Sequence, residues 1–128
     1  MTGVNWLPDR RYEFGHGAVA LERDGDLRRV VVSGDLDLST VARVRLAIES
    51  ACESTPAKLV VDLSAVEFVD SHGLQLLVAT QRRLAAGGCS LVLVPPVEHV
   101  RRVFTLTGLD RFLGEEPTAG AAATGGCD

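Results

Sequence analysis

The apolar residues of this chain follow two kinds of pattern, and the two kinds alternate along the chain. Residues 18–23 and 27–33 have the spacing of strands, and Asp24-Gly25 between them predicts a hairpin turn. Residues 58–63 and 89–94 are nearly continuous apolar runs, which are typical of strands covered on both faces. The pattern therefore predicts four strands.

Three other segments repeat apolar residues every three or four positions, as amphipathic helices do. They are residues 41–53, 71–86 and 96–107. Ser39 or Thr40 is placed to cap the first of these helices. The faces predicted to be buried are Val41, Val44, Ile48 and Ala51; Leu74, Leu77, Val78, Leu84 and Ala85; and Val97, Val100, Val103 and Phe104.

The order of the elements predicts a single α/β domain, which we place at residues 16–114. Strands that alternate with helices form a mostly parallel sheet with helices packed against it, and the first hairpin makes the sheet mixed by adding an antiparallel edge. Residues 1–15 form either a loose arm or an added edge element. Residues 115–128, rich in Ala, Gly and Thr, are predicted to be a disordered tail.

Composition narrows the kind of protein. The net charge of −4 and the pI near 5.3 argue against direct binding of nucleic acid. No run approaches the roughly 20 apolar residues of a membrane helix, and no export signal precedes the domain, so we expect a cytoplasmic protein without membrane contact. Cys52 and Cys89 are predicted to be small buried residues, and Cys127 lies in the tail. Their spacing implies neither a metal nor another cofactor.

Candidate functional residues occupy two loops that follow strands. They are Asp35 and Asp37 within residues 34–39, and Asp70, Ser71, His72 and Gly73 directly after the apolar run 58–69. Sheets of this class carry functional loops at the carboxyl ends of their strands. Ser71 is placed at a helix start, where unpaired N–H groups favour added negative charge. From position alone, Ser71 is either part of the helix cap or a side chain that another protein modifies.

The other candidates also have structural alternatives. Asp70 is expected first to cap the helix, and a contact with a partner is compatible with that role. For Asp37 the sequence is equally compatible with a solvated loop carboxylate or cap and with a partner contact. Gly73 permits either the close approach of a partner's backbone or a tight strand-to-helix turn.

His72 beside Ser71 suggests a Ser-His hydrolase, but the arrangement argues against one. Adjacent side chains at a helix start point apart, and the members of a triad come from separate segments. The Gly-x-Ser-x-Gly pattern is also absent, because Val69 stands at its first position. His99 is expected on the outer face of the last helix. We therefore expect no catalytic residue and no enzyme activity.

Three segments resemble the STAS domain family, specifically the bacterial anti-sigma factor antagonists. They are residues 33–37 (Ser-Gly-Asp-Leu-Asp), residues 60–74 with Asp-Ser-His-Gly-Leu at their end, and residues 95–109 from Pro-Pro-Val to Thr-Gly-Leu. The resemblance covers about residues 18–113, with the same order and spacing. The chain departs from the family pattern at Asp35, where Glu is usual, and at His72, where Ser, Thr or Ala is more frequent.

The resemblance implies a partner switch. In this family the unmodified antagonist binds an anti-sigma factor that is also an ATP-dependent serine kinase, and binding releases the sigma factor. Phosphorylation of the serine after the loop aspartate, here Ser71, weakens the complex, and a phosphatase reverses it. By this resemblance Asp37 helps to dock the kinase. The partner-binding surface is predicted to comprise Asp35, Asp37, Asp70, His72 and Gly73, on a protein that is a monomer when free.

The STAS fold also occurs in other assemblies, which leaves a second function open. The chain would then be a module of a stressosome-like scaffold or a subunit of a lipid-transport complex, without control of a sigma factor. The identity of the partner separates this alternative from the first.

Overall fold

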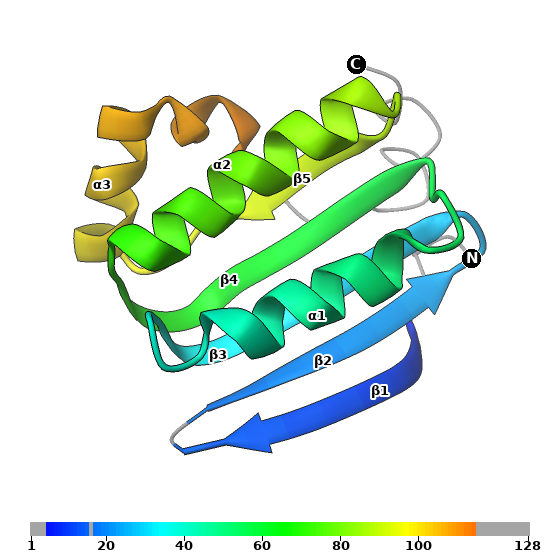
Figure 1. Ribbon diagram of the computed structural model, residues 1–128, viewed down its shortest axis with the longest axis horizontal. Coiled ribbons are helices and arrows are strands. Elements are labelled where there is room, and N and C mark those ends of the chain that lie inside the picture. Colours follow the sequence, from blue (N-terminus) through cyan, green and yellow to red (C-terminus); the bar gives the residue numbers. More distant parts are fainter. Residues whose placement is uncertain (1–4, 16, 115–128) are drawn as a thin grey trace.

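The computed structural model describes residues 5–15 and 17–114, in which helices pack on a five-stranded sheet (Figure 1). The strands are β1 (Leu7–Phe14), β2 (Gly17–Asp24), β3 (Leu27–Leu36), β4 (Lys58–Val69) and β5 (Ser90–Val94). The helices are α1 (Val41–Cys52), α2 (Ser71–Ala86), α3 (Glu98–Thr107) and the 3-10 helix η1 (Leu109–Phe112). This order confirms the predicted α/β class.

The strands lie across the sheet in chain order. β1, β2 and β3 pair antiparallel, whereas β3, β4 and β5 pair parallel, so the sheet is mixed as predicted. The crossover helices α1 and α2 lie on the same face, and α3 lies beside α2 (Figure 1). No helix in the described part of the chain is long and apolar enough to cross a membrane. Because β3 and β4 are parallel neighbours, the loops that follow them emerge at the same edge.

Residues 7–14 form the edge strand β1. Of the two structures predicted for residues 1–15, a loose arm or an added edge element, this part of the chain therefore forms the edge element. β1 pairs with β2, and its register shifts between Pro8 and Arg10. A shift is expected there because proline has no N–H to donate to the ladder. The predicted tail, including Cys127, lies outside the described residues.

The core lies between the sheet and its helices. A row of paired residues crosses four strands, and each member is at most 3% exposed: Leu21, Val30, Val61 and Leu93. The face predicted for α1 is buried in full, together with Ala47. The helical period therefore identified correctly which side of α1 meets the sheet.

The predicted faces of α2 and α3 were wrong in part. α2 buries Leu76 and Thr80, whereas Ala85 is exposed and Leu74 and Val78 are half-buried. A polar residue at position 80 does not suggest burial, but the Thr80 hydroxyl donates a hydrogen bond to the carbonyl of Leu76 (2.8 Å), which satisfies it without water.

The α3 prediction failed at its first residue and held further on. Val97 is 40% exposed because α3 begins only at Glu98, whereas Val100 and Phe104 are buried and Val103 is half-buried. Pro96, the first residue of the predicted helix 96–107, therefore precedes α3.

The central strands are longer than the sequence pattern predicted. β3 continues to Leu36 and β4 to Val69, and these two last residues pair with each other. The end of β3 is half-buried up to Leu36, and the end of β4 buries only Val66 and Val69 among exposed residues, unlike the continuous apolar runs from which the strands were predicted.

The two described cysteines are half-buried rather than buried. Cys89 precedes β5, which begins at Ser90, and Cys52 ends α1. Partial burial raises the pKa of both thiols, because the thiolate loses hydration there. That shift disfavours the reactive thiolate form.

Variants of one buried and one exposed apolar residue of α3, Phe104 and Leu106, test this packing. Phe104 is fully buried, so Phe104→Ala should lower the free energy of unfolding by about 3–5 kcal/mol. Leu106 is 87% exposed on the same helix, so Leu106→Ala should change it by less than about 0.5 kcal/mol. Urea unfolding of both variants measures this difference, and equal losses would contradict the described orientation of α3.

Candidate functional site

The loops after β3 and β4 meet at the carboxyl edge of the sheet. Leu36 and Val69 are paired, and the N–H of Asp70 donates to the carbonyl of Leu36 (3.2 Å). Residues 37–40 and the start of α2 thus lie side by side, although 32 positions separate Leu38 from Asp70 in the chain. The structure brings the two predicted loops together as expected for neighbouring parallel strands.

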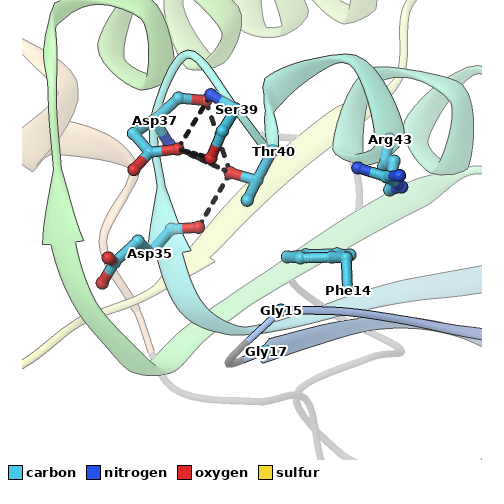
Figure 2. Close-up of a pocket in the computed structure, with 8 residues that line it drawn as sticks. All are labelled: Phe14, Gly15, Gly17, Asp35, Asp37, Ser39, Thr40 and Arg43. Carbon is cyan, nitrogen blue, oxygen red and sulfur yellow. Dashed lines mark hydrogen bonds between the residues drawn. The ribbon is translucent and has the colours of Figure 1, made fainter.

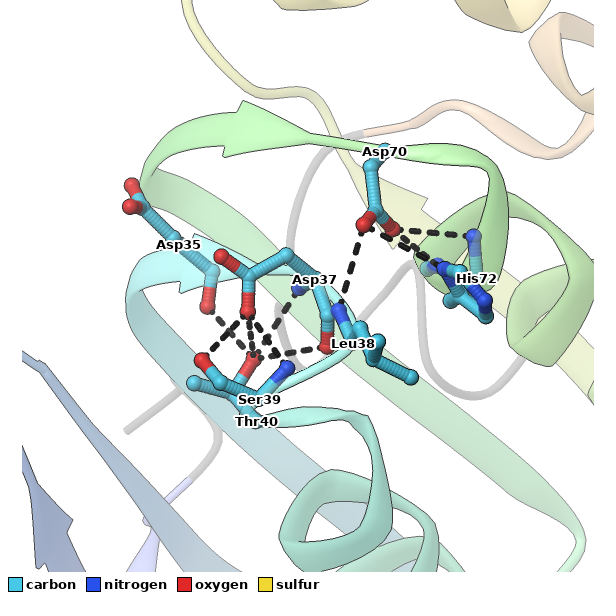
Figure 3. A network of polar contacts seen from close by, with 8 residues as sticks. Asp35, Asp37, Leu38, Ser39, Thr40, Asp70 and His72 are labelled. Carbon is cyan, nitrogen blue, oxygen red and sulfur yellow. Dashed lines mark hydrogen bonds and ion pairs between the residues drawn. The ribbon is translucent and has the colours of Figure 1, made fainter.

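Asp70 joins the two loops through its carboxylate (Figure 3). One oxygen, Oδ1, accepts hydrogen bonds from the N–H groups of His72 (2.9 Å) and Gly73 (3.1 Å). These bonds make Asp70 the N-cap of α2, which confirms its expected structural role. The other oxygen, Oδ2, accepts from the N–H of Leu38 (3.1 Å). A single side chain therefore caps α2 and fixes the loop between β3 and α1.

These contacts also set the charge state of Asp70. Partial burial by itself raises the pKa of Asp70, but the hydrogen bonds from Gly73, Leu38 and His72 stabilise the charged form and outweigh it. The pKa consequently lies below its usual value. Asp70 is an anion at neutral pH and contributes negative charge to this edge of the molecule.

Ser71 is the first residue of α2 and is exposed. Within residues 5–15 and 17–114, no hydrogen bond involves its hydroxyl group. Asp70 supplies the cap of α2, so the Ser71 side chain does not cap the helix. An exposed, unbonded hydroxyl at this place is sterically open to an approaching protein.

His72 lies against Asp70. Its Nδ1 is 3.4 Å from Oδ2 of Asp70, and its side chain is 46% exposed (Figure 3). The imidazole thus contacts the capping carboxylate, and no hydrogen bond within the described residues joins it to the Ser71 hydroxyl. This arrangement lacks the nucleophile–base contact that a Ser-His hydrolase needs.

Gly73 is buried where α2 crosses the end of β3. A Cβ atom at this position would lie 2.5 Å from the carbonyl oxygen of Leu36 and 2.8 Å from its Cγ. Both distances are far below van der Waals contact. Glycine therefore allows the first turn of α2 to approach the backbone of Leu36, which is a close approach within this chain.

Asp37 organises the other loop. Its Oδ1 accepts hydrogen bonds from the N–H (3.0 Å) and the hydroxyl (2.7 Å) of Ser39, and its carbonyl accepts from the N–H groups of Thr40 and Val41. The buried Thr40 hydroxyl turns back to the carbonyl of Asp35 (2.8 Å). Thr40 occupies the N-cap position of α1, as predicted, but neither its hydroxyl nor that of Ser39 makes a capping hydrogen bond to α1. The hydroxyls are instead used inside the turn.

A cavity of about 270 Å³ lies beside this turn (Figure 2). Asp35 and Asp37 line one side, and Phe14 and Arg43 line the other. The Arg43 guanidinium lies 5.8 Å from the centre of the Phe14 ring, within range of a cation–π contact. Asp35 therefore belongs to this cavity, whereas Asp37 belongs both to the cavity and to the loop that Asp70 holds.

Two exposed apolar residues at this edge were not predicted. Leu38 is 65% exposed in the loop that Asp70 holds, and Phe68 is 51% exposed near the end of β4. The signal available for Leu38 was a leucine within the otherwise polar stretch 37–40. No local pattern predicted the exposure of Phe68, because the strand was predicted to end at residue 63.

The arrangement suits docking better than catalysis. It combines an exposed hydroxyl, three carboxylates and apolar side chains on a preorganised edge. In the described part of the chain, no group of three or more His, Cys, Asp or Glu residues could hold a metal ion. The fold and the loops define an α/β domain with an acidic, partly apolar surface at the carboxyl edge of its sheet.

Comparison with known proteins places this domain in a family. The family described as "Mlab, STAS domain" matches residues 19–115. The anti-sigma-F factor antagonist RsfB of Mycobacterium tuberculosis is 36% identical over 94 residues, which are 73% of this chain and 76% of that protein. The chain therefore belongs to the STAS domain family.

Solved structures agree with this assignment. The crystal structure of an anti-sigma factor antagonist from Mycobacterium paratuberculosis superposes with a TM-score of 0.69 at 35% identity, over 86% of this chain and 93% of that one. The anti-sigma factor antagonist SpoIIAA in its unphosphorylated form gives a TM-score of 0.68 at 25% identity, over 77% and 88% of the two chains. The fold expected from the resemblance is confirmed.

Variants of Asp70 separate its two roles. Asp70→Asn keeps an oxygen for the N–H groups of His72 and Gly73 but places an amide donor against the N–H of Leu38, so it should cost about 1 kcal/mol. Asp70→Ala removes every contact and should cost about 2 kcal/mol. Urea unfolding at neutral pH measures both losses, and equal stability of all three proteins would contradict the linking role.

The contribution of Asp70 should depend on pH. Its pKa is lower in the folded than in the unfolded protein, so its stabilisation is present above about pH 4, the unfolded value, and is lost as the pH falls through the folded pKa. The stability gap between the parent protein and Asp70→Asn should therefore narrow in acid. A gap that stays constant would show that the charge of Asp70 is not involved.

Proposed function

We propose that this protein is an anti-sigma factor antagonist that is switched off by phosphorylation of Ser71. The observation that carries the proposal is the exposed, unbonded Ser71 hydroxyl on the docking edge that Asp70 organises. Its membership of the STAS family and its similarity to named anti-sigma factor antagonists support the same role rather than a scaffold or a transport subunit. The chain then acts as a binding partner and a substrate, not as an enzyme.

In the unmodified state the docking edge binds an anti-sigma factor that is also a serine kinase, and the sigma factor is released. Leu38 and Phe68 supply apolar area that loses its water on binding, which favours association. Asp37 is held in place by its turn, so little conformational freedom is lost when a basic group of the kinase approaches it. Gly73 contributes indirectly, by letting α2 sit close enough for its cap to hold Leu38.

Phosphorylation changes the charge of this edge. The Ser71 oxygen attacks the γ-phosphorus of ATP, ADP leaves, and the hydroxyl proton passes to a base of the kinase. The product carries roughly −1.5 to −2 additional charges. The N–H groups of His72 and Gly73 are already bonded to Asp70, so they are poorly available to neutralise the phosphate. The added charge is therefore felt by the partner, and a phosphatase that removes it restores binding.

Ser71 variants test the switch. Incubation of the full chain with its kinase and ATP should add one phosphate, located at Ser71 by mass spectrometry, and Ser71→Ala should abolish it. Ser64→Ala, at another exposed serine, should label like the parent protein. Ser71→Asp should bind the kinase about 30- to 1000-fold more weakly, equivalent to about 2–4 kcal/mol, while it remains folded. Persistent labelling of Ser71→Ala would remove Ser71 from the site.

Asp37 variants test the docking surface. Asp37→Asn preserves an oxygen that can accept the hydrogen bonds from Ser39, so its unfolding free energy should change by less than about 1 kcal/mol. It loses the negative charge, so kinase affinity should fall about tenfold. Titration calorimetry measures the affinity and urea unfolding measures the stability. Unchanged affinity would exclude Asp37 from the interface.

A further inference from the structure

The edge strand β1 presents a second surface, remote from Ser71. β1 pairs with β2 on one side, and no element in the described part of the chain pairs with its other side. An unpaired strand edge exposes backbone N–H and C=O groups that another strand can bond. Such an edge is suited to one particular partner only if the side chains beside it select that partner.

Only part of β1 can accept a regular partner strand. Pro8 has no N–H, and the register shift between Pro8 and Arg10 disturbs the start of the strand. Residues 10–14 follow this irregularity and contain no proline. This five-residue window has Tyr12 at its centre, with Arg11 and Glu13 on either side.

We propose that β1 pairs antiparallel with β1 of a second copy of this chain, with the two-fold axis at Tyr12. In this arrangement Tyr12 lies opposite Tyr12, Arg11 lies opposite Glu13 in both directions, and Arg10 lies opposite Phe14. Opposite charges and aromatic side chains directly across an antiparallel pair are the favourable combinations. The two sheets then join into one continuous sheet.

Charge excludes the neighbouring registers. A two-fold axis perpendicular to the sheet keeps each residue on its own face, so the central residue always faces its own copy. Centring on Arg11 sets Arg11 against Arg11 and Asp9 against Glu13. Centring on Arg10 or on Glu13 likewise sets that residue against its own charge. Centring on Phe14 opposes no like charges, but it runs past the end of β1 and leaves only Glu13 and Phe14 of the window beside a partner strand. Tyr12 is therefore the centre that pairs all of residues 10–14 without opposing like charges.

The side chains are available for this pairing. Arg11 and Glu13 lie on the same face of β1, and Nε of Arg11 is 3.6 Å from Oε2 of Glu13. Their side chains are 61% and 78% exposed. Tyr12 is 46% exposed and lines a groove of about 670 Å³ between β1 and α1, where Leu46 is 65% exposed. A second Tyr12 ring at this groove covers apolar surface that otherwise faces water.

The proposal departs from the sequence-based prediction of a free monomer, because the sequence pattern does not show that residues 7–14 form an edge strand. It does not depend on the proposed function, because Arg11, Tyr12 and Glu13 lie on the edge strand β1 and Ser71 lies at the start of α2, after β4. The two surfaces approach each other only at Phe14, which lines the cavity of Asp35 and Asp37.

Light scattering of the full chain across a concentration series tests the dimer. The mass should rise to twice the 13.6 kDa of the chain. Arg11→Glu and Glu13→Arg should each weaken dimerisation at least tenfold, because each opposes like charges in the Tyr12-centred register. The double variant Arg11→Glu/Glu13→Arg should restore it, because the exchange recreates the complementary pairs.

Arg45→Glu is the matched control, since Arg45 is exposed on α1 and does not line the groove. This variant should dimerise like the parent protein. At a concentration so low that every protein is a monomer, all variants should unfold at the parent's urea midpoint. Three results would overturn the proposal. They are a monomer up to about 1 mM, single variants that dimerise like the parent, or a double variant that stays as weak as the single ones.

Discussion

The carboxylate of Asp70 is the contact on which the geometry of the functional edge depends. One of its oxygens completes the first turn of α2, and the other holds the N–H of Leu38 in the preceding loop. A carboxylate accepts several hydrogen bonds at once, so it can join two segments that a hydroxyl at the same place could cap only one at a time. The positions of Ser71, Asp37 and Leu38 relative to one another follow from this arrangement.

The carboxylate can make these contacts only because the backbones around it are close. Leu36 and Val69 end paired strands, and Gly73 leaves room for α2 against the carbonyl of Leu36. A larger residue at position 73 would displace the helix start and lengthen the bond to Leu38. Packing and hydrogen bonding thus act together. Gly73 lets the start of α2 lie close to Leu36, and at that distance Asp70 can accept the hydrogen bond from Leu38.

The two sides of the sheet differ in how charge is arranged. Asp37 and Asp70 give the carboxyl edge of the sheet one sign of charge, to which the proposed phosphate on Ser71 would add. Arg11 and Glu13 on β1 alternate in sign, which leaves that edge nearly neutral and complementary to itself. Uniform charge suits a switch that a different protein detects, whereas alternating charge suits association of identical strands.

Local sequence patterns determined the type and order of the central elements, the boundaries of α2 and the exposure of Ser71 at its start, because periodicity and helix signals act within one turn or strand. They did not determine that β1 pairs, that β4 reaches Val69 or that Asp70 holds Leu38. Those features depend on segments distant in the chain, whose contacts form only when the sheet assembles. Tertiary structure therefore decided how the candidate residues are joined into one surface.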